Sequence, residues 1–246
     1  MSLNTRKAVQ IQRQYYTETA AQYDSMHAHE GDDDLNSLKF VLSTLRAVDA
    51  KTVLDVGAGT GRGIRHLLDA LPALSIRGIE PVGALIQQSV QSNGLSNGTI
   101  LQGSGDALPF ADASFDVVCS FALLHHVPKP QAVVGEMLRV ARKGVIISDS
   151  NRFGQGRWPI RVLKLGLYKA GLWGLVNFLK TGGKGYMLTE GDGLAYSYSV
   201  YDSFDQIAKW AQQIILIPTE AGHSTSWFHP LLTSAGVTVC ALKDPI

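Results

Sequence analysis

Cysteine is scarce in this sequence, and its positive and negative charges nearly balance. The two cysteines, Cys119 and Cys240, lie in apolar runs that each predict a strand, so we expect buried free thiols and neither a disulfide framework nor a zinc site. The formal net charge of +1 gives no general attraction to nucleic acid, and no nucleic-acid partner is predicted. The first residues are polar and lack the apolar core of a secretory signal, which favours a cytoplasmic location.

The order of apolar segments predicts an α/β fold. Between residues 51 and 150, short β-branched runs alternate with helical stretches, which is typical of a parallel sheet with crossover helices. We expect strands at 52–56, 75–79, 99–102, 115–121, 144–149, 214–218 and 237–242, and helices at 9–23, 35–48, 62–71, 82–92 and 130–141. A single domain is expected, with an N-terminal helical cap (1–50), a core (51–150), an insertion or lid (151–205) and the final strands of the core (206–246).

The strand at 52–56 runs into a glycine-rich turn that is followed by a helix. Glycines let a backbone turn tightly and approach a ligand, and the next helix offers unpaired N–H groups and a partial positive charge. A dinucleotide-binding turn, G-x-G-x-x-G, would need a third glycine where this chain has Arg62, so an NAD-dependent oxidoreductase is disfavoured. Glu80 ends the next strand, where an acid can accept hydrogen bonds from two ribose hydroxyls. The segment therefore predicts a nucleotide site.

Four segments of the core resemble a known family. They read VLDVGAGTGRG at 53–63, IRGIEP at 76–81, QGSGDALPFADASFDVV at 102–118 and CSFALLHHVPKP at 119–130. Together they resemble the class I S-adenosylmethionine (SAM)-dependent methyltransferases, in the type-11 group that includes ubiquinone and menaquinone biosynthesis methyltransferases. The resemblance implies a Rossmann-like, doubly wound sheet of seven strands with the last one antiparallel, an N-terminal helical cap and a helical insertion before the last two strands. It also implies methyl transfer from SAM, which leaves S-adenosylhomocysteine.

The resemblance assigns expected roles to the matching positions. The glycine turn would surround the methionine part and the ribose of SAM, and Glu80 would hold the ribose hydroxyls. The family usually has Asp-Ala or Asn-Ala where this chain has Ser104-Gly105, so the adenine contact falls to Ser104 or to Asp106. For Tyr15 and Tyr16, packing of an aromatic helix face is the alternative to a contact with SAM. The cofactor-binding residues expected are Asp55, Gly57, Ala58, Gly59, Thr60, Gly61, Glu80, Pro81, Ser104, Gly105, Asp106, Ala107, Ser120, Phe121 and, from the N-terminal segment, Tyr23.

Two adjacent histidines, His125 and His126, are the candidate catalytic groups. They follow the fourth strand, whose C-terminal end faces the ligand crevice in such sheets. His126 matches a histidine common in the family, which favours positioning, while His125 is freer to contact the acceptor or accept its proton; a structural role for either stays open. No metal site is predicted, because the histidine- and acid-rich stretch 27–34 lacks the order of a calcium loop. His223 and His229 lie between the last two strands without an assigned role.

Acidic residues are absent from 150 to 189, where basic and apolar residues alternate. Arg157, Arg161 and Lys164 share one helical face, and an apolar stripe that includes Ile160 and Leu163 runs beside it. The stripe can pack on the core with the basic residues solvated, form a lid that attracts an anionic substrate, or contact anionic lipid through 156–180.

The sequence as a whole thus predicts a SAM-dependent methyltransferase that acts on a small-molecule or lipid-like acceptor at O, N or C. The alternative is a SAM- or nucleotide-binding protein without methyl transfer. The two alternatives differ in whether S-adenosylhomocysteine is released when an acceptor is present.

Overall fold

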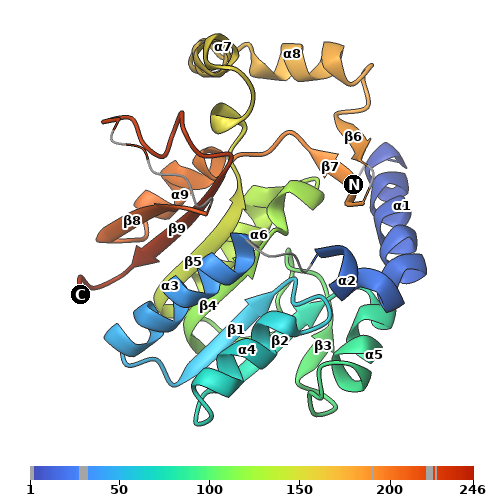
Figure 1. Ribbon diagram of the computed structural model, residues 1–246, viewed down its shortest axis with the longest axis vertical. Coiled ribbons are helices and arrows are strands. Elements are labelled where there is room, and N and C mark those ends of the chain that lie inside the picture. Colours follow the sequence, from blue (N-terminus) through green and yellow to red (C-terminus); the bar gives the residue numbers. More distant parts are fainter. Residues whose placement is uncertain (1–2, 28–32, 190, 220–223, 225) are drawn as a thin grey trace.

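The computed structural model of the chain describes residues 3–27, 33–189, 191–219, 224 and 226–246. Its main sheet has seven strands in the order β3–β2–β1–β4–β5–β9–β8 (Figure 1). Strand β9 is antiparallel to both of its neighbours and the other pairs are parallel, which confirms the predicted fold class. The strands are β1 (Thr52–Val56), β2 (Ser75–Glu80), β3 (Ile100–Gln102), β4 (Phe115–Phe121), β5 (Ala141–Ser150), β8 (Gln213–Pro218) and β9 (Gly236–Leu242).

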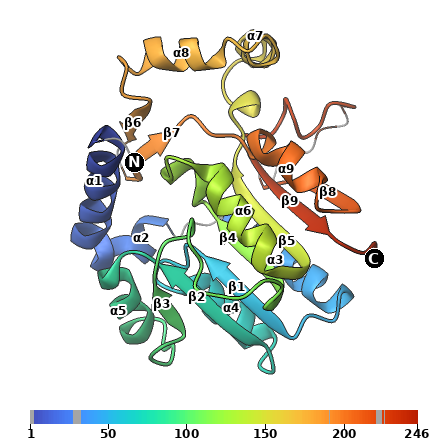
Figure 2. The same ribbon diagram turned by 180° about the vertical axis from the view of Figure 1, so that it is seen from behind.

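Helices cover both faces of this sheet, because consecutive residues of a strand point to opposite sides. Val53 and Ile146 join a core with α3 and α4, whereas Leu54 and Ile147 join the core under α6 (Figures 1 and 2). Each face is thereby closed by helices, of which α3, α4, α5 and α6 were predicted from the sequence to within a few residues, while α9 was not predicted. The helices that pack on or beside the sheet are α3 (Asp33–Ala47), α4 (Arg62–Ala70), α5 (Gly83–Gln91), α6 (Pro130–Val140) and α9 (Phe204–Ala208).

The order of the strands brings several loops to one edge of the sheet. The chain runs outward from β1 through β2 to β3 and then returns to β4 on the other side of β1. Ligands of doubly wound sheets bind outside the carboxyl ends of the strands, at such a reversal. The loops that follow β1, β2 and β4 therefore meet where a ligand is expected.

The N-terminal helices and a β-hairpin lie beside this edge (Figure 1). The expected helix at 9–23 begins earlier and is broken, and it packs against α5 and β7. The insertion was expected to be helical, but its end forms the hairpin, in which Tyr186 pairs with Tyr196 and Leu188 with Leu194. These elements are α1 (Leu3–Thr19), η1 (Ala20–Gln22), α2 (Tyr23–His27), β6 (Tyr186–Thr189) and β7 (Gly193–Tyr196), followed by η4 (Val200–Ser203); η2 (Leu124–His126) contacts β7.

Two helices of the insertion, α7 (Trp158–Lys169) and α8 (Trp173–Lys180), stand apart from the sheet at the top of Figure 1. Both are fully described, and none of their residues is buried. Ile160 and Leu163 of the predicted apolar stripe are 47% and 56% exposed, so the stripe does not pack on the core. Among the described residues, no helix combines the length and the apolar character that crossing a bilayer requires.

Some basic residues of the insertion are held by the protein rather than solvated. Arg152, in η3 (Arg152–Gly154), is buried. Arg161 donates a hydrogen bond to the carbonyl oxygen of Leu232 at 2.9 Å, and Lys164 donates one to the carbonyl oxygen of Arg152 at 3.0 Å. The base of the insertion is therefore fixed to the core, while its apolar surface is open to solvent.

Candidate functional site

The turn after β1 needs its glycines both for conformation and for space. Gly57, Gly59 and Gly61 have φ values of 81°, 54° and 75°, in the left-handed region that favours glycine. A Cβ atom on Gly57 would lie 2.9 Å from the Leu123 side chain, and one on Gly61 would lie 2.4 Å from that of Leu95. The G-x-G-x-G spacing therefore sets one backbone path for the turn, and α4 begins directly after it.

Glu80 ends β2 beside this turn and is 5% exposed. Its Oε2 accepts a hydrogen bond from the Gly59 N–H at 3.1 Å, and its Oε1 accepts one from the Val82 N–H at 2.9 Å. Burial raises the pKa of this carboxyl to about 7, although the two backbone hydrogen bonds act in the opposite direction. Each oxygen keeps a further lone pair, so the carboxylate can accept two more hydrogen bonds from a diol of a ligand.

A cavity of about 610 Å³ connects the glycine turn, the ends of β2 and β4, and α1. Eight predicted cofactor residues and one predicted catalytic residue line it: Tyr23, Gly57, Gly59, Glu80, Pro81, Ser104, Asp106, Phe121 and His126. The other predicted residues lie outside its described lining: Asp55, Ala58, Thr60, Gly61, Gly105, Ala107, Ser120 and His125. Arg6 and Arg13 also line the cavity, but they belong to no motif, so the sequence offered no signal for them; Lys129 lines it too and lies in the motif at 119–130, but no role was predicted for it.

The departure from the family pattern at Gly105 has a packing reason. A Cβ atom on Gly105 would lie 2.9 Å from the Val56 side chain and 3.0 Å from that of Val133. The alanine that the family usually has does not fit here without a shift of these neighbours. Ser104 donates a hydrogen bond from its Oγ to the Asp106 carboxylate at 2.5 Å, so the two candidates for the adenine contact form one polar unit at the cavity wall.

The N-terminal segment closes over the glycine turn. Tyr16 and Tyr23 both line the cavity, and their rings meet edge to face with centroids 5.7 Å apart. Asp24 accepts hydrogen bonds from the Thr60 hydroxyl at 2.5 Å and from the Asn93 side chain at 3.0 Å. These contacts tie the segment to the turn, so the helical cap covers the edge where the resemblance placed the cofactor.

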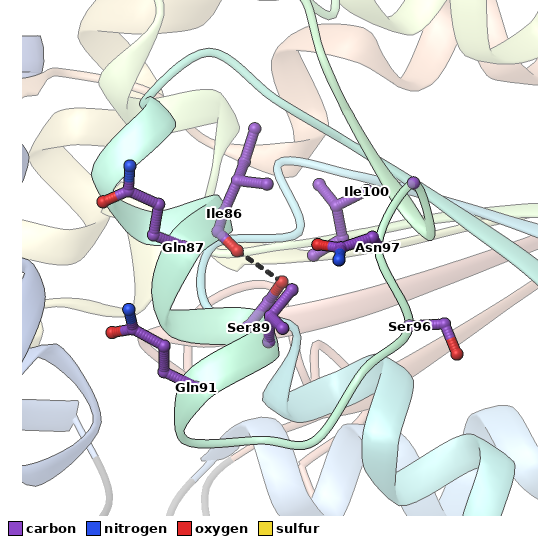
Figure 3. Close-up of a pocket in the computed structure, with 9 residues that line it drawn as sticks. Ile86, Gln87, Ser89, Gln91, Ser96, Asn97 and Ile100 are labelled. Carbon is purple, nitrogen blue, oxygen red and sulfur yellow. Dashed lines mark hydrogen bonds between the residues drawn. The ribbon is translucent and has the colours of Figure 1, made fainter.

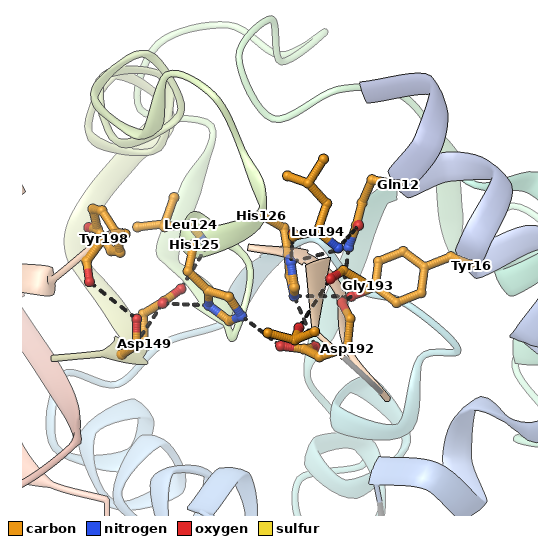
Figure 4. A network of polar contacts seen from close by, with 12 residues as sticks. Gln12, Tyr16, Leu124, His125, His126, Asp149, Asp192, Gly193, Leu194 and Tyr198 are labelled. Carbon is orange, nitrogen blue, oxygen red and sulfur yellow. Dashed lines mark hydrogen bonds and ion pairs between the residues drawn. The ribbon is translucent and has the colours of Figure 1, made fainter. Parts of the chain in front are cut away.

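A polar network surrounds the two histidines of η2 (Figure 4). Nδ1 of His125 lies 2.7 Å from Oδ1 of Asp149, and Oδ2 of Asp149 accepts a hydrogen bond from the Leu124 N–H at 2.7 Å. Asp192 comes just before β7, and its carboxylate faces both histidines. Its Oδ2 lies 3.4 Å from Nε2 of His125, and its Oδ1 lies 3.1 Å from Nε2 of His126. Burial acts to lower the pKa of His125, but Asp149 and Asp192 outweigh it and raise this pKa to about 10. A protonated His125 cannot accept a proton, so we expect its part in the site to be electrostatic or structural at neutral pH.

The remaining candidate residues lie elsewhere or beyond the described part of the chain. His229 Nδ1 lies 2.5 Å from the Thr233 hydroxyl, within the loop between β8 and β9. His223 falls outside the described residues, as do His29, Glu30 and Asp32 of the acid-rich stretch that the sequence analysis considered.

A second depression lies between α5 and the loop before β3 (Figure 3). Ser89 there donates a hydrogen bond to the carbonyl oxygen of Ile86 at 2.7 Å. The described lining consists of amide, hydroxyl and aliphatic groups and contains no titratable side chain. Of these two cavities in the described part of the chain, only the larger one is therefore lined by groups that can serve in acid–base chemistry.

Comparison with known proteins agrees with this geometry. Residues 54–148 match the family model described as a methyltransferase domain. An uncharacterized methyltransferase of Mycobacterium avium is 38% identical over 94 residues, which are 38% of this chain and 36% of that protein. The match thus spans about a third of the length of that curated relative, whose other regions are not aligned.

Solved structures of similar fold extend over most of the chain. Magnesium protoporphyrin IX methyltransferase of Synechocystis, with S-adenosylhomocysteine bound, has a TM-score of 0.60 at 16% identity and covers 96% of this chain and 100% of that one. The DhpI–SAM–HEP complex has a TM-score of 0.62 at 16% identity and covers 100% of both chains. Residues 54–148 are thus similar to the methyltransferase-domain family, and the chain has the Rossmann-like fold of these solved methyltransferase structures.

Proposed function

We propose that this protein transfers a methyl group from SAM to a small-molecule or lipid-like acceptor. The observation that carries the proposal is that the glycine turn, the buried Glu80 carboxylate and His126 line the same cavity. Glu80 would hold the ribose hydroxyls, and Ser104 with Asp106 would contact the adenine edge. Proteins of the same fold with SAM or S-adenosylhomocysteine bound support this choice of cofactor.

The contribution of the chain's own residues is positioning and the exclusion of water. SAM supplies a methyl group already activated on a sulfonium, so the protein mainly aligns the acceptor atom with the methyl carbon and sulfur. His126 lies in the cavity wall with the apolar side chains of Leu123 and Val127, and Arg6 and Lys129 add positive charge to the same lining. Such a lining suits an acceptor with an apolar body and a polar or anionic group.

Calorimetry with SAM, S-adenosylhomocysteine and NAD tests the cofactor. We expect the first two to bind and NAD not to bind; saturable NAD binding without SAM binding would overturn the proposal. Release of S-adenosylhomocysteine with hydroxylated aromatic, amine or lipid-like acceptors then tests catalysis. SAM binding without release for any acceptor class would favour a binding protein instead.

We further propose that the outer surface of α7 and α8 contacts anionic lipid. Leu175, Phe178 and Leu179 on α8 are 58%, 58% and 69% exposed, and Trp158 on α7 is 47% exposed. This apolar surface lies within residues 150–189, where basic residues occur without any acidic ones. Exposed apolar groups together with one sign of charge are typical of peripheral binding to an anionic membrane. A membrane location would favour a lipid-like acceptor.

Replacing Phe178 and Leu179 together by serine is expected to weaken binding to vesicles that contain phosphatidylglycerol by about tenfold or more, because two exposed apolar groups are lost. Cosedimentation with such vesicles measures the effect. The matched control is Leu101→Ser, which removes a 37% exposed leucine on β3, far along the sheet from the insertion. Equal vesicle binding by the double variant and the wild type would refute the lipid contact.

A further inference from the structure

Three potential metal ligands converge next to the cavity, although they come from distant parts of the sequence. One ligand atom each of His125, His126 and Asp192 lies within 4.8 Å of the others. The histidines belong to η2 and the aspartate comes just before β7, so packing of the hairpin against η2 creates the cluster (Figure 4). No metal was predicted from the sequence, where only the stretch 27–34 was weighed as a metal site, and these three residues form no local motif.

The two imidazole rings are held so that both Nε2 atoms face Asp192. Nδ1 of His125 lies 2.7 Å from the Asp149 carboxylate, and Nδ1 of His126 lies 2.7 Å from the carbonyl oxygen of Leu194. Both oxygens accept hydrogen bonds, so each ring keeps a hydrogen on Nδ1 and offers Nε2 to an ion. The pKa of His125 is raised to about 10, so an ion that binds its Nε2 must displace the proton held there at neutral pH. A carboxylate or a backbone carbonyl behind the ring is the arrangement that orients histidines in metal sites.

Gln12 strengthens this orientation from α1. Its Oε1 accepts a hydrogen bond from the Leu194 N–H at 2.5 Å, and its Nε2 donates to the carbonyl oxygen of Asp192 at 3.3 Å. The Gln12 Nε2 also lies 3.1 Å from Nδ1 of His126. The Leu194 carbonyl oxygen is nearer to this Nδ1, at 2.7 Å, so we assign the ring hydrogen to the hydrogen bond with Leu194. The amide therefore fixes the loop that carries Asp192 relative to the histidines.

We propose that Nε2 of His125, Nε2 of His126 and the Asp192 carboxylate bind a divalent transition-metal ion. Two imidazoles and one carboxylate suit ions such as Zn²⁺, Co²⁺ or Fe²⁺ and leave coordination positions open. The hydroxyl of Tyr16 lies 3.0 Å from Nε2 of His126, and both residues line the cavity. An ion at this place would hold an oxygen or nitrogen of a ligand in the cavity, which makes it a site for anchoring the acceptor.

The test uses the full chain without an affinity tag, stripped of metal with a chelator. Calorimetry with Zn²⁺ and visible absorption with Co²⁺ are expected to show saturable binding of one ion per chain. Asp192→Asn and His126→Gln should each weaken binding by about tenfold or more, since each removes a ligand. The matched controls are Asp205→Asn, an exposed acid of α9, and His66→Gln on α4, which should bind as the wild type does.

The Asp192 variant keeps the test decisive if a histidine variant does not fold. The Asp192 side chain is 42% exposed, so its substitution should be tolerated, and circular dichroism without metal checks this. Absence of stoichiometric Zn²⁺ and Co²⁺ binding to the wild type, or unchanged binding by a folded Asp192→Asn variant, overturns the proposal. Because the readout is metal binding in the absence of SAM, this result stands apart from any failure to detect methyl transfer.

Discussion

Replacing Arg152 by methionine is expected to lower the free energy of unfolding by about 3–5 kcal/mol, because it leaves a largely buried carboxylate without its cation. The guanidinium contacts the Asp202 carboxylate, and the two side chains are 6% and 14% exposed. It also lies over the rings of Tyr168 on α7 and Trp173 on α8, at 5.6 and 5.1 Å from their centroids. Within the insertion, Arg152 thus joins α7 and α8 to η4, and its loss affects all three elements.

Urea denaturation measures this effect, and a double variant separates charge from packing. Arg152→Met combined with Asp202→Leu removes both charges, so it should unfold at a higher urea concentration than Arg152→Met alone. The double variant still loses the hydrogen bond from the Ser199 N–H to Asp202, so its free energy of unfolding should not exceed that of the wild type. Arg157→Met, at an exposed position next to α7, is the control. A single variant as stable as the wild type would show that the pair contributes nothing to folding.

The core of the fold and half of the site follow from local sequence. Strands β1 and β4 begin and end where their apolar runs predicted, because a buried parallel strand must be apolar on both faces. Gly57, Gly59 and Glu80 were predicted from spacing alone, and all three line the cavity. Spacing suffices for them because one strand, one turn and the end of the next strand fix their relative positions.

The rest of the site depends on contacts between distant segments, which no local pattern reports. Asp192 lies 66 positions after His126, and nothing in its neighbourhood distinguishes it from a solvated acid. Arg152 was indistinguishable from the exposed basic residues that follow it, although it is buried against Asp202. For the apolar stripe of α7, amphipathic spacing predicted an apolar face but not what covers it, and the exposure of Ile160 and Leu163 excludes packing on the core among the three alternatives.

Replacing Glu80 by alanine is expected to weaken SAM binding by about 1–3 kcal/mol, because the ribose hydroxyls lose a charged acceptor. The same change removes the partners of the Gly59 and Val82 N–H groups, so part of the loss comes from a less ordered turn. Glu80→Gln separates the two causes. The amide oxygen of glutamine still accepts a hydrogen bond from one backbone N–H, whereas its NH₂ group faces the other N–H and cannot accept a hydrogen bond from it. Titration calorimetry measures both variants, with the exposed Glu18→Ala as the control. Unchanged affinity in Glu80→Ala would remove the ribose role from this residue.

The pH dependence of SAM binding tests the same carboxylate without any substitution. Burial raises the pKa of Glu80 to about 7, so the group is mostly protonated at pH 6 and mostly ionised at pH 8. A protonated carboxyl has one oxygen occupied by its own hydrogen, which makes it a poorer acceptor for a diol. If the carboxylate is the binding form, affinity for SAM should rise by about tenfold from pH 6 to pH 8, following its ionised fraction. The amino group of SAM also titrates, and the Glu80→Ala variant is the control for this effect. The rise in affinity that is due to Glu80 must vanish in that variant. A rise of equal size in both proteins would show that the titrating group belongs to SAM.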